Sequence, residues 1–206
     1  FVFPDPIINI VTPAARPDLE ESASELNEIQ FQVWDMIAGR TNPELGGSED
    51  LLDILGMNFY HSNQWECEGE KLDWSQTPRD SRWKPLSQIM ERVWARYHRP
   101  LFLAETSHVG SGRADWIREV AEETLLALRR GIPIEGICIF PIIDRYDWEN
   151  RDHWHNSGLW DLENDGALGR VLNKDYASAL DQAQRIMALA SGIEIALSLN
   201  HHGSSK

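Results

Sequence analysis

Short apolar runs alternate with amphipathic, helix-like segments along most of this chain, and this alternation limits the possible folds more than any other feature. Apolar runs of this length are typical of strands buried in a parallel sheet. A helix that connects two such strands forms a right-handed crossover, which keeps the strands parallel. We expect strands at 1–3, 51–59, 101–105 and 134–143, and helices at 22–39, 85–97, 114–130 and 174–190.

Four successive strand–helix units predict an α/β fold that amounts to half of an eight-stranded (β/α)8 barrel, or TIM barrel, approximately strands 5–8 with their helices. The first strand looks like the end of a strand whose beginning is missing, because Pro4-Asp5-Pro6 interrupts it at once. We expect one domain over residues 1–195 and a flexible tail over residues 196–206.

The helix expected at 22–39 has the clearest signals of its own. Ser22 is a suitable N-cap, and Glu25 follows three residues later, as in a capping box. Helical spacing predicts that five apolar side chains share its buried face: Leu26, Ile29, Val33, Trp34 and Ile37.

Charge and cysteine content exclude several classes of function. The net charge of −14 argues against nucleic acid and anionic membranes as partners, since both require a basic surface. Two cysteines, Cys67 and Cys138, indicate neither a disulfide framework nor a metal site, and Cys138 reads as a buried small apolar residue. His153 and His155 lack a further ligand nearby in sequence, so a solvated loop is favoured over zinc. We expect no cofactor and no metal.

Targeting signals are absent from the predicted organisation. No apolar segment is long enough to span a membrane, and the first residues do not resemble a signal peptide. We therefore expect a cytoplasmic protein.

Tryptophan is frequent, with nine residues, and many of them fall in expected loops. Sugar rings present apolar C–H faces that suit an indole in a loop. The alternative is that these rings only fix long loops onto the scaffold. The tryptophans in question are Trp65, Trp74, Trp83, Trp148, Trp154 and Trp160.

Polar side chains gather where each expected strand ends. Glu105 ends the apolar run at 101–105, at the position where α/β barrels place catalytic groups. Asn58 and Tyr60 end the preceding strand and point to one face, so they could orient Glu105 and keep it ionised. Alternatively, Asn58 and Tyr60 are satisfied polar groups that close the top of a barrel core. The fourth strand leads to Asp144, Asp147 and Trp148.

These three strand ends resemble motifs of glycoside hydrolase family 1, the β-glucosidase-like enzymes. Asn58-Phe59-Tyr60 resembles the family's Asn-x-Tyr after strand six, and Leu103-Ala104-Glu105-Thr106 resembles its nucleophile motif, Ile-Thr-Glu-Asn. Asp144-Arg145-Tyr146-Asp147-Trp148 resembles its Asp-Asn-Phe-Glu-Trp segment. The motifs occur in the family's order, and the resemblance covers roughly residues 20–190.

The resemblance implies a retaining β-glycosidase with Glu105 as nucleophile and Tyr60 as its hydrogen-bonding partner. Asn58 would lie near the sugar, Asp147 would bind sugar hydroxyls, and Trp148 would stack on the ring. Trp65 is a further candidate for sugar binding. Departures from the family pattern include Thr106, which replaces an Asn, and Asp147, which replaces the longer Glu.

Retaining hydrolysis needs a second carboxyl group about 5–5.5 Å from the nucleophile. The family places this acid/base in an Asn-Glu pair after strand four; Asn27-Glu28 lies within an expected helix and does not fit that role. We therefore expect the acid/base on a missing N-terminal half. A half barrel exposes two sheet edges, so we expect a homodimer or pairing with a complementary half. The competing hypothesis is a non-catalytic carbohydrate-binding or interaction module with a barrel-derived fold.

Overall fold

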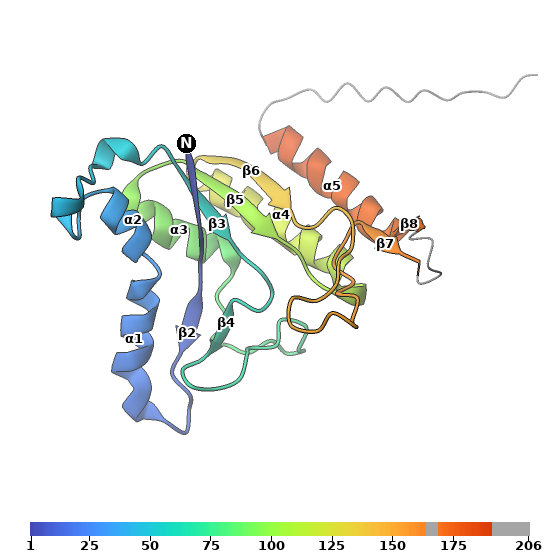
Figure 1. Ribbon diagram of the computed structural model, residues 1–206, viewed down its shortest axis with the longest axis horizontal. Coiled ribbons are helices and arrows are strands. Elements are labelled where there is room, and N and C mark those ends of the chain that lie inside the picture. The colour runs from blue at the N-terminus through green and yellow to red at the C-terminus, as the bar shows by residue number, and fades with distance from the viewer. Residues whose placement is uncertain (164–168, 191–206) are drawn as a thin grey trace, which may run out of the picture.

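A four-stranded parallel sheet forms the centre of the computed structural model, which describes residues 1–163 and 169–190 (Figure 1). The strands lie side by side in chain order, and every neighbouring pair is parallel. The α/β class with parallel strands is therefore confirmed. The four strands are β1 (Val2–Pro6), β3 (Ile54–Asn58), β5 (Leu101–Thr106) and β6 (Ile134–Ile139).

Helices connect these strands, and Figure 1 shows α3 and α4 behind the sheet. Two short sheets flank it: β2 pairs with β4 in parallel, and β7 pairs with β8 in antiparallel orientation. The predicted domain end at 195 and the tail 196–206 lie outside the described residues. The helices are α1 (Glu20–Ile29), α2 (Gln32–Ile37), α3 (Leu86–Tyr97), α4 (Arg113–Arg129) and α5 (Lys174–Ala190); the short strands are β2 (Asn9–Val11), β4 (Gln64–Glu66), β7 (Trp160–Leu162) and β8 (Arg170–Leu172).

The two faces of the central sheet have different surroundings. On one face Leu55, Leu101 and Leu103 are fully buried in a core shared with the helices. Because side chains alternate along a strand, Asn58 and Cys138 turn to the opposite face, which we call the open face. Cys138 is exposed there, so its predicted burial is wrong: it alternates with the apolar side chains that face the helices.

One β-bulge determines which face Glu105 occupies. Met57 pairs with Leu103, but the next residue of β3, Asn58, pairs with Glu105, so Ala104 is an extra residue in β5. Strict alternation from Leu103 would aim Glu105 at the helices. The bulge turns Glu105 to the open face instead, as bulges beside functional sites commonly do.

The segment expected as one helix at 22–39 forms two helices. α1 ends at Ile29 and α2 begins at Gln32, and Ser22 is not the N-cap, since α1 begins at Glu20. Trp34 is fully buried, whereas the other apolar positions of the predicted face are at most partly buried. The exposed positions of that face are Leu26, Ile29 and Val33.

Backbone groups of β2 and of Ile8, just before it, explain this rotation of α1. The Asn27 side chain accepts a hydrogen bond from the Ile10 N–H at 3.0 Å and donates to the Ile10 carbonyl at 2.7 Å. Gln30 accepts from the Ile8 N–H at 2.9 Å. The helix therefore turns amides toward a strand edge that needs partners, which leaves its apolar stripe facing outward.

Both outer strands differ from their predicted limits. In β1 the prolines do not end the strand as expected, whereas a proline follows the early end of β6. β1 continues through Pro4 and Pro6, since the missing N–H groups lie on the side away from β3, as at a sheet edge. β6 ends at Ile139, and Pro141 follows two residues later, so the strand does not reach residue 143. Ile142 and Ile143 are exposed in consequence.

The described residues contain no helix with the length and apolar content needed to cross a bilayer.

Candidate functional site

The carboxyl ends of β3 and β5 bring Tyr60 and Glu105 into direct contact. The Tyr60 hydroxyl donates a hydrogen bond to Glu105 Oε2 at 2.7 Å. Burial raises the pKa of Tyr60, and the hydrogen bond to Glu105 raises it further, so the phenol keeps its proton at neutral pH. Among the described residues, no donor reaches Glu105 Oε1. One carboxylate oxygen is thus held, and the other is left free.

Asn58 lies in register with Glu105 on the neighbouring strand. Its side-chain oxygen Oδ1 is buried and has no hydrogen-bond donor within the described part of the chain. Buried amide oxygens are rarely left without a partner, and exceptions concentrate at functional sites. The Asn58 side chain therefore offers an unused hydrogen-bond acceptor in register with Glu105.

Arg145 extends the site from the loop that follows β6, and sequence reasoning gave it no role. Its charge opposes the rise in the Tyr60 pKa that burial and Glu105 produce. The guanidinium carbon lies 4.7 Å from the Trp148 ring centroid and 5.7 Å from that of Phe140. A signal was present, because Arg145 lies between Asp144 and Trp148 in the polar segment that follows the fourth expected strand.

Trp148 and Asp147 lie in the same loop but differ in how they face the site. Trp148 is 78% exposed and stacks across Arg145, so its ring is available to a ligand. Asp147 Oδ1 accepts hydrogen bonds from the backbone N–H groups of Glu149 at 2.8 Å and Asn150 at 3.3 Å. The Glu149 N–H in particular lowers the pKa of Asp147. Asp147 thus stabilises its own loop, and no described contact joins it to Glu105.

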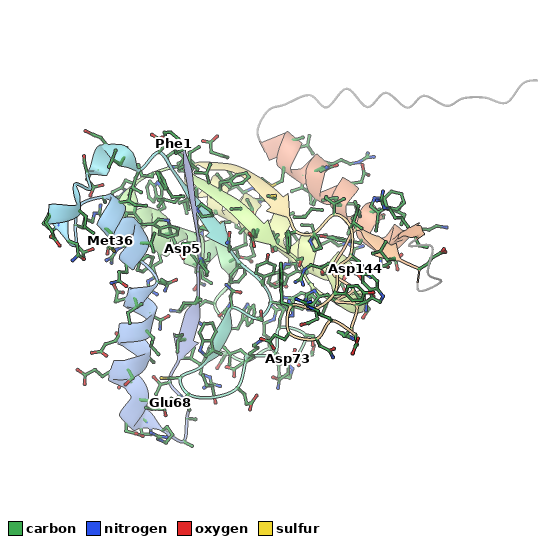
Figure 2. All side chains as sticks on the ribbon, in the orientation of Figure 1. Phe1, Asp5, Met36, Glu68, Asp73 and Asp144 are labelled. Carbon is green, nitrogen blue, oxygen red and sulfur yellow. The ribbon has the colours of Figure 1, made fainter. Side chains whose placement is uncertain are left out.

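Buried polar contacts fix the base of this loop. Asp144 is 5% exposed and accepts from the Ser157 N–H at 3.0 Å, while Arg113 donates to Asp161 at 2.6 Å and to the Gly158 carbonyl. Figure 2 shows Asp144 at the carboxyl end of β6, on the side where the connecting loops gather. The loop therefore presents Arg145 from a rigid base.

The remaining predicted tryptophan, Trp65, lies on β4 and is partly buried against a small cluster that includes Ile10 and Cys67. No described contact connects it to Glu105. Trp74 and Trp83 are each 8% exposed in the main core. For these two rings, the alternative of fixing loops onto the scaffold is the correct one.

A second cluster lies directly behind the site, on the helix face. The rings of His61 and His108 lie 3.9 Å apart between centroids, beside Trp74 and Trp116. Burial, together with the nearby His108, lowers the pKa of His61 to about 4, so this imidazole is neutral at neutral pH. Sequence reasoning missed this cluster, because its members come from four separate segments.

Thr106 belongs to the same layer. It is fully buried, and its hydroxyl accepts a hydrogen bond from Trp116 Nε1 at 2.8 Å. Thr106 follows Glu105 but faces away from the open face. The Thr106 hydroxyl therefore contributes to the packing behind the site.

No metal-binding cluster of three or more His, Cys, Asp or Glu side chains occurs in residues 1–163 and 169–190.

Similarity to solved structures is extensive in fold and low in sequence. The β-glucosidase from Pyrococcus furiosus aligns with a TM-score of 0.63 and 12% identity, over 92% of this chain and 43% of its own. The Thermotoga maritima β-glucosidase in complex with glucoimidazole gives 0.61 and 13%, over 88% and 50%. The β-glycosidase from Thermosphaera aggregans gives 0.59 and 16%, over 92% and 45%.

No protein-family model and no curated protein sequence matches this chain. At identities of 12–16% the structural likeness establishes the fold alone. The chain spans about half the length of the glycosidases that it matches. It is an α/β segment with a parallel sheet, similar to part of a TIM-barrel glycosidase.

Proposed function

We propose that this chain supplies the nucleophile side of a retaining β-glycosidase site. The 2.7 Å hydrogen bond from Tyr60 to Glu105 carries the proposal, because it orients a carboxylate at the carboxyl end of a parallel strand. Asn58 and Trp148 would bind the sugar on the open face. Asp147 and Trp65 would contact sugar hydroxyls or rings farther from Glu105.

The reaction is a double displacement. Glu105 Oε1 attacks the anomeric carbon, the glycosidic C–O bond breaks, and the leaving oxygen takes a proton from a general acid. Water then attacks the glycosyl ester with the same group acting as base, which releases the sugar with its configuration retained and restores Glu105. Tyr60 holds Oε2 throughout, so the attacking oxygen keeps one direction.

The general acid would come from outside this chain. Glu28, from the Asn-Glu pair, forms ion pairs with Arg92 and Arg96 of α3 in the helical layer and does not lie on the open face. We therefore propose that a second copy or a complementary half barrel completes the sheet and brings the second carboxyl group. A stable monomer by light scattering, with no affinity for either partner, would contradict this.

Covalent labelling tests the nucleophile. An activated 2-deoxy-2-fluoro β-glycoside should label Glu105 with the mass of one sugar when the acid-bearing partner is present. Glu105→Gln should abolish labelling and lower turnover of an aryl β-glycoside about 10³-fold or more. Glu135→Gln, a change at an exposed carboxylate of β6, is the matched control and should leave both unchanged.

The competing hypothesis gives a different result in the same experiment. A non-catalytic carbohydrate-binding module would bind the glycoside but show no label on Glu105 under any presentation. Labelling at another carboxylate would also refute the proposal.

A further inference from the structure

Arg145 is a partly buried cation that lacks a carboxylate partner among the described residues. Its Nη1 donates to the Tyr146 carbonyl at 2.7 Å. Its Nε is buried without an acceptor anywhere in the described ranges. Arg113 and Arg96, by contrast, form ion pairs with Asp161 and Asp35. Arg99 also has a buried Nε without an acceptor in the described ranges, but it lies after α3, away from the carboxyl ends of the strands.

An unpaired guanidinium in this position is costly. Arginine keeps its charge at every accessible pH, so it cannot avoid the desolvation by losing a proton. A buried charge is normally compensated by an opposite charge with hydrogen bonds. The Arg145 guanidinium therefore lacks a counter-charge among the described residues, and a bound anion would supply it.

The position of Arg145 indicates where such an anion would lie. The guanidinium carbon lies 4.7 Å from the Trp148 ring centroid and 5.7 Å from that of Phe140, whose backbone N–H donates to the carbonyl of Thr106, the residue after Glu105, at 3.0 Å. A sugar that stacks on Trp148 and reaches Glu105 would pass Arg145. The cation therefore lies at the same end of the sheet as Glu105.

We propose that Arg145 selects glycosides whose sugar carries a negative charge, an inference that rests on the proposed function because it names the sugar class of the same site. The bond to the Tyr146 carbonyl occupies Nη1 and leaves the edge formed by Nε and Nη2. This edge offers two parallel N–H donors, which match the two oxygens of a carboxylate. The Trp148 indole covers the guanidinium but is 78% exposed, so it can shift without disrupting the core.

Charge balance favours the same conclusion. An ionised Glu105 would repel an anionic sugar held in the same pocket, and the repulsion is strong where water is partly excluded. Arg145 offsets one of the two negative charges. A neutral sugar would not need this cation, and it would leave the guanidinium uncompensated.

Equilibrium binding to the full chain tests the proposal with a readout independent of turnover. Calorimetric titration would compare methyl β-glucuronide, its uncharged methyl ester, methyl β-glucoside and methyl β-glucoside 6-phosphate. The glucuronide should bind at least about 10-fold more tightly than the ester and the glucoside, as expected for a charge-assisted double hydrogen bond. Equal or tighter binding of the phosphate ester would support the charge selection and assign it to phosphate.

Two variants and a control assign the effect to Arg145. Arg145→Gln should abolish the preference for the glucuronide over the neutral ligands. Arg145→Lys, which keeps the charge but not the paired donors, should retain part of that preference. Arg151→Gln alters an exposed arginine of the same loop and should leave the preference unchanged. Circular dichroism establishes that each variant is folded.

The outcomes separate this inference from the hydrolytic function. Charged and neutral ligands that bind equally, or a preference that survives Arg145→Gln, would overturn the inference, as would failure of all four ligands to bind. Glu105 labelled equally fast by neutral and acidic 2-fluoroglycosides would leave the nucleophile intact while refuting charge selection. Binding selective for the acidic sugar without labelling would support Arg145 and refute the nucleophile.

Discussion

Two tyrosine–carboxylate pairs among the described residues have the same hydrogen-bond length, but the two carboxylates differ in burial and in ion pairing. Tyr97 donates to Asp35 at 2.7 Å in the helical layer, and Tyr60 donates to Glu105 at 2.7 Å on the open face. Asp35 is 5% exposed and also forms an ion pair with Arg96. Glu105 is only partly buried and has no arginine within ion-pair distance in the described ranges.

The two carboxylates differ in how fully protein donors satisfy their oxygens and those of their neighbours. At Asp35 the hydrogen bonds from Arg96 and Tyr97 outweigh the effect of burial on the pKa. The carboxylate therefore stays ionised, and protein donors satisfy its oxygens. At Glu105 one oxygen is held and one is free, and Asn58, in register with it, has an unpaired side-chain oxygen. A carboxylate that has a free oxygen, beside neighbours with unsatisfied polar atoms, is available to bind a ligand. A carboxylate with both oxygens bonded to protein donors stabilises the fold.

Removal of the Asp35 charge should give the largest effect on stability. Asp35→Asn leaves Arg96 without its nearest counter-ion, and we expect a loss of about 3 kcal/mol in the free energy of unfolding. The Arg96 side chain remains one-third exposed and keeps its contact with Glu28, which limits the loss. Urea denaturation at pH 7 measures it. Sugar binding at the open face should not change.

The pH dependence of this loss has a defined sign. Burial alone would raise the pKa of Asp35, but the hydrogen bonds from Arg96 and Tyr97 lower it below its ordinary value of 3.8. Its contribution is therefore complete above about pH 4 and decreases as pH falls through the folded pKa. Wild type and Asp35→Asn should converge below pH 4, and a constant difference down to pH 2 would contradict this assignment.

Removal of the Tyr60 hydroxyl should affect reactivity more than stability. Tyr60→Phe deletes one charge-assisted hydrogen bond to Glu105 Oε2, and the labelling rate of Glu105 should fall about 30-fold. The ring remains, so the free energy of unfolding should change by less than about 1 kcal/mol.

Tyr97→Phe is the matched control, since it deletes a hydrogen bond of the same length to the other carboxylate. It should lower stability by about 1 kcal/mol and leave the labelling rate unchanged. If both variants changed the labelling rate equally, the contrast between the two pairs would have no functional meaning.

Sequence periodicity predicts the central strands and most of the helices, because strong apolar runs and caps are local features. The helices expected at 85–97 and 114–130 are found at Leu86–Tyr97 and Arg113–Arg129. Periodicity failed at 22–39, since the amide of Asn27 binds β2, a strand that pairs with the distant β4, and the amide of Gln30 binds Ile8 just before it. Such pairing leaves no local pattern in the sequence.

The candidate site was predictable in position but not in orientation. The apolar run before Glu105 indicates a strand end, but alternation along β5 would have aimed Glu105 into the helical core. The bulge at Ala104 is set by register between β3 and β5, which no single segment encodes. Arg145 was missed for a related reason, because its meaning depends on rings and a hydroxyl brought together by the fold.

Tyr60 and His61 are adjacent in sequence and face opposite sides of the sheet, and this allows a last test of the two environments. Burial and the nearby His108 lower the pKa of His61 from 6.5 to about 4. A histidine with a lowered folded pKa binds protons more readily in the unfolded chain, so stability is intact above pH 6.5 and falls as pH drops from 6.5 to 4. His61→Phe cannot be protonated, and it should lose about 1.5 kcal/mol less over this interval. His153→Gln, at an exposed histidine, should behave as wild type. Acid loss between pH 6.5 and 4 that persists in full in His61→Phe would mean that the layer behind the site is not the acid-sensitive part of the fold.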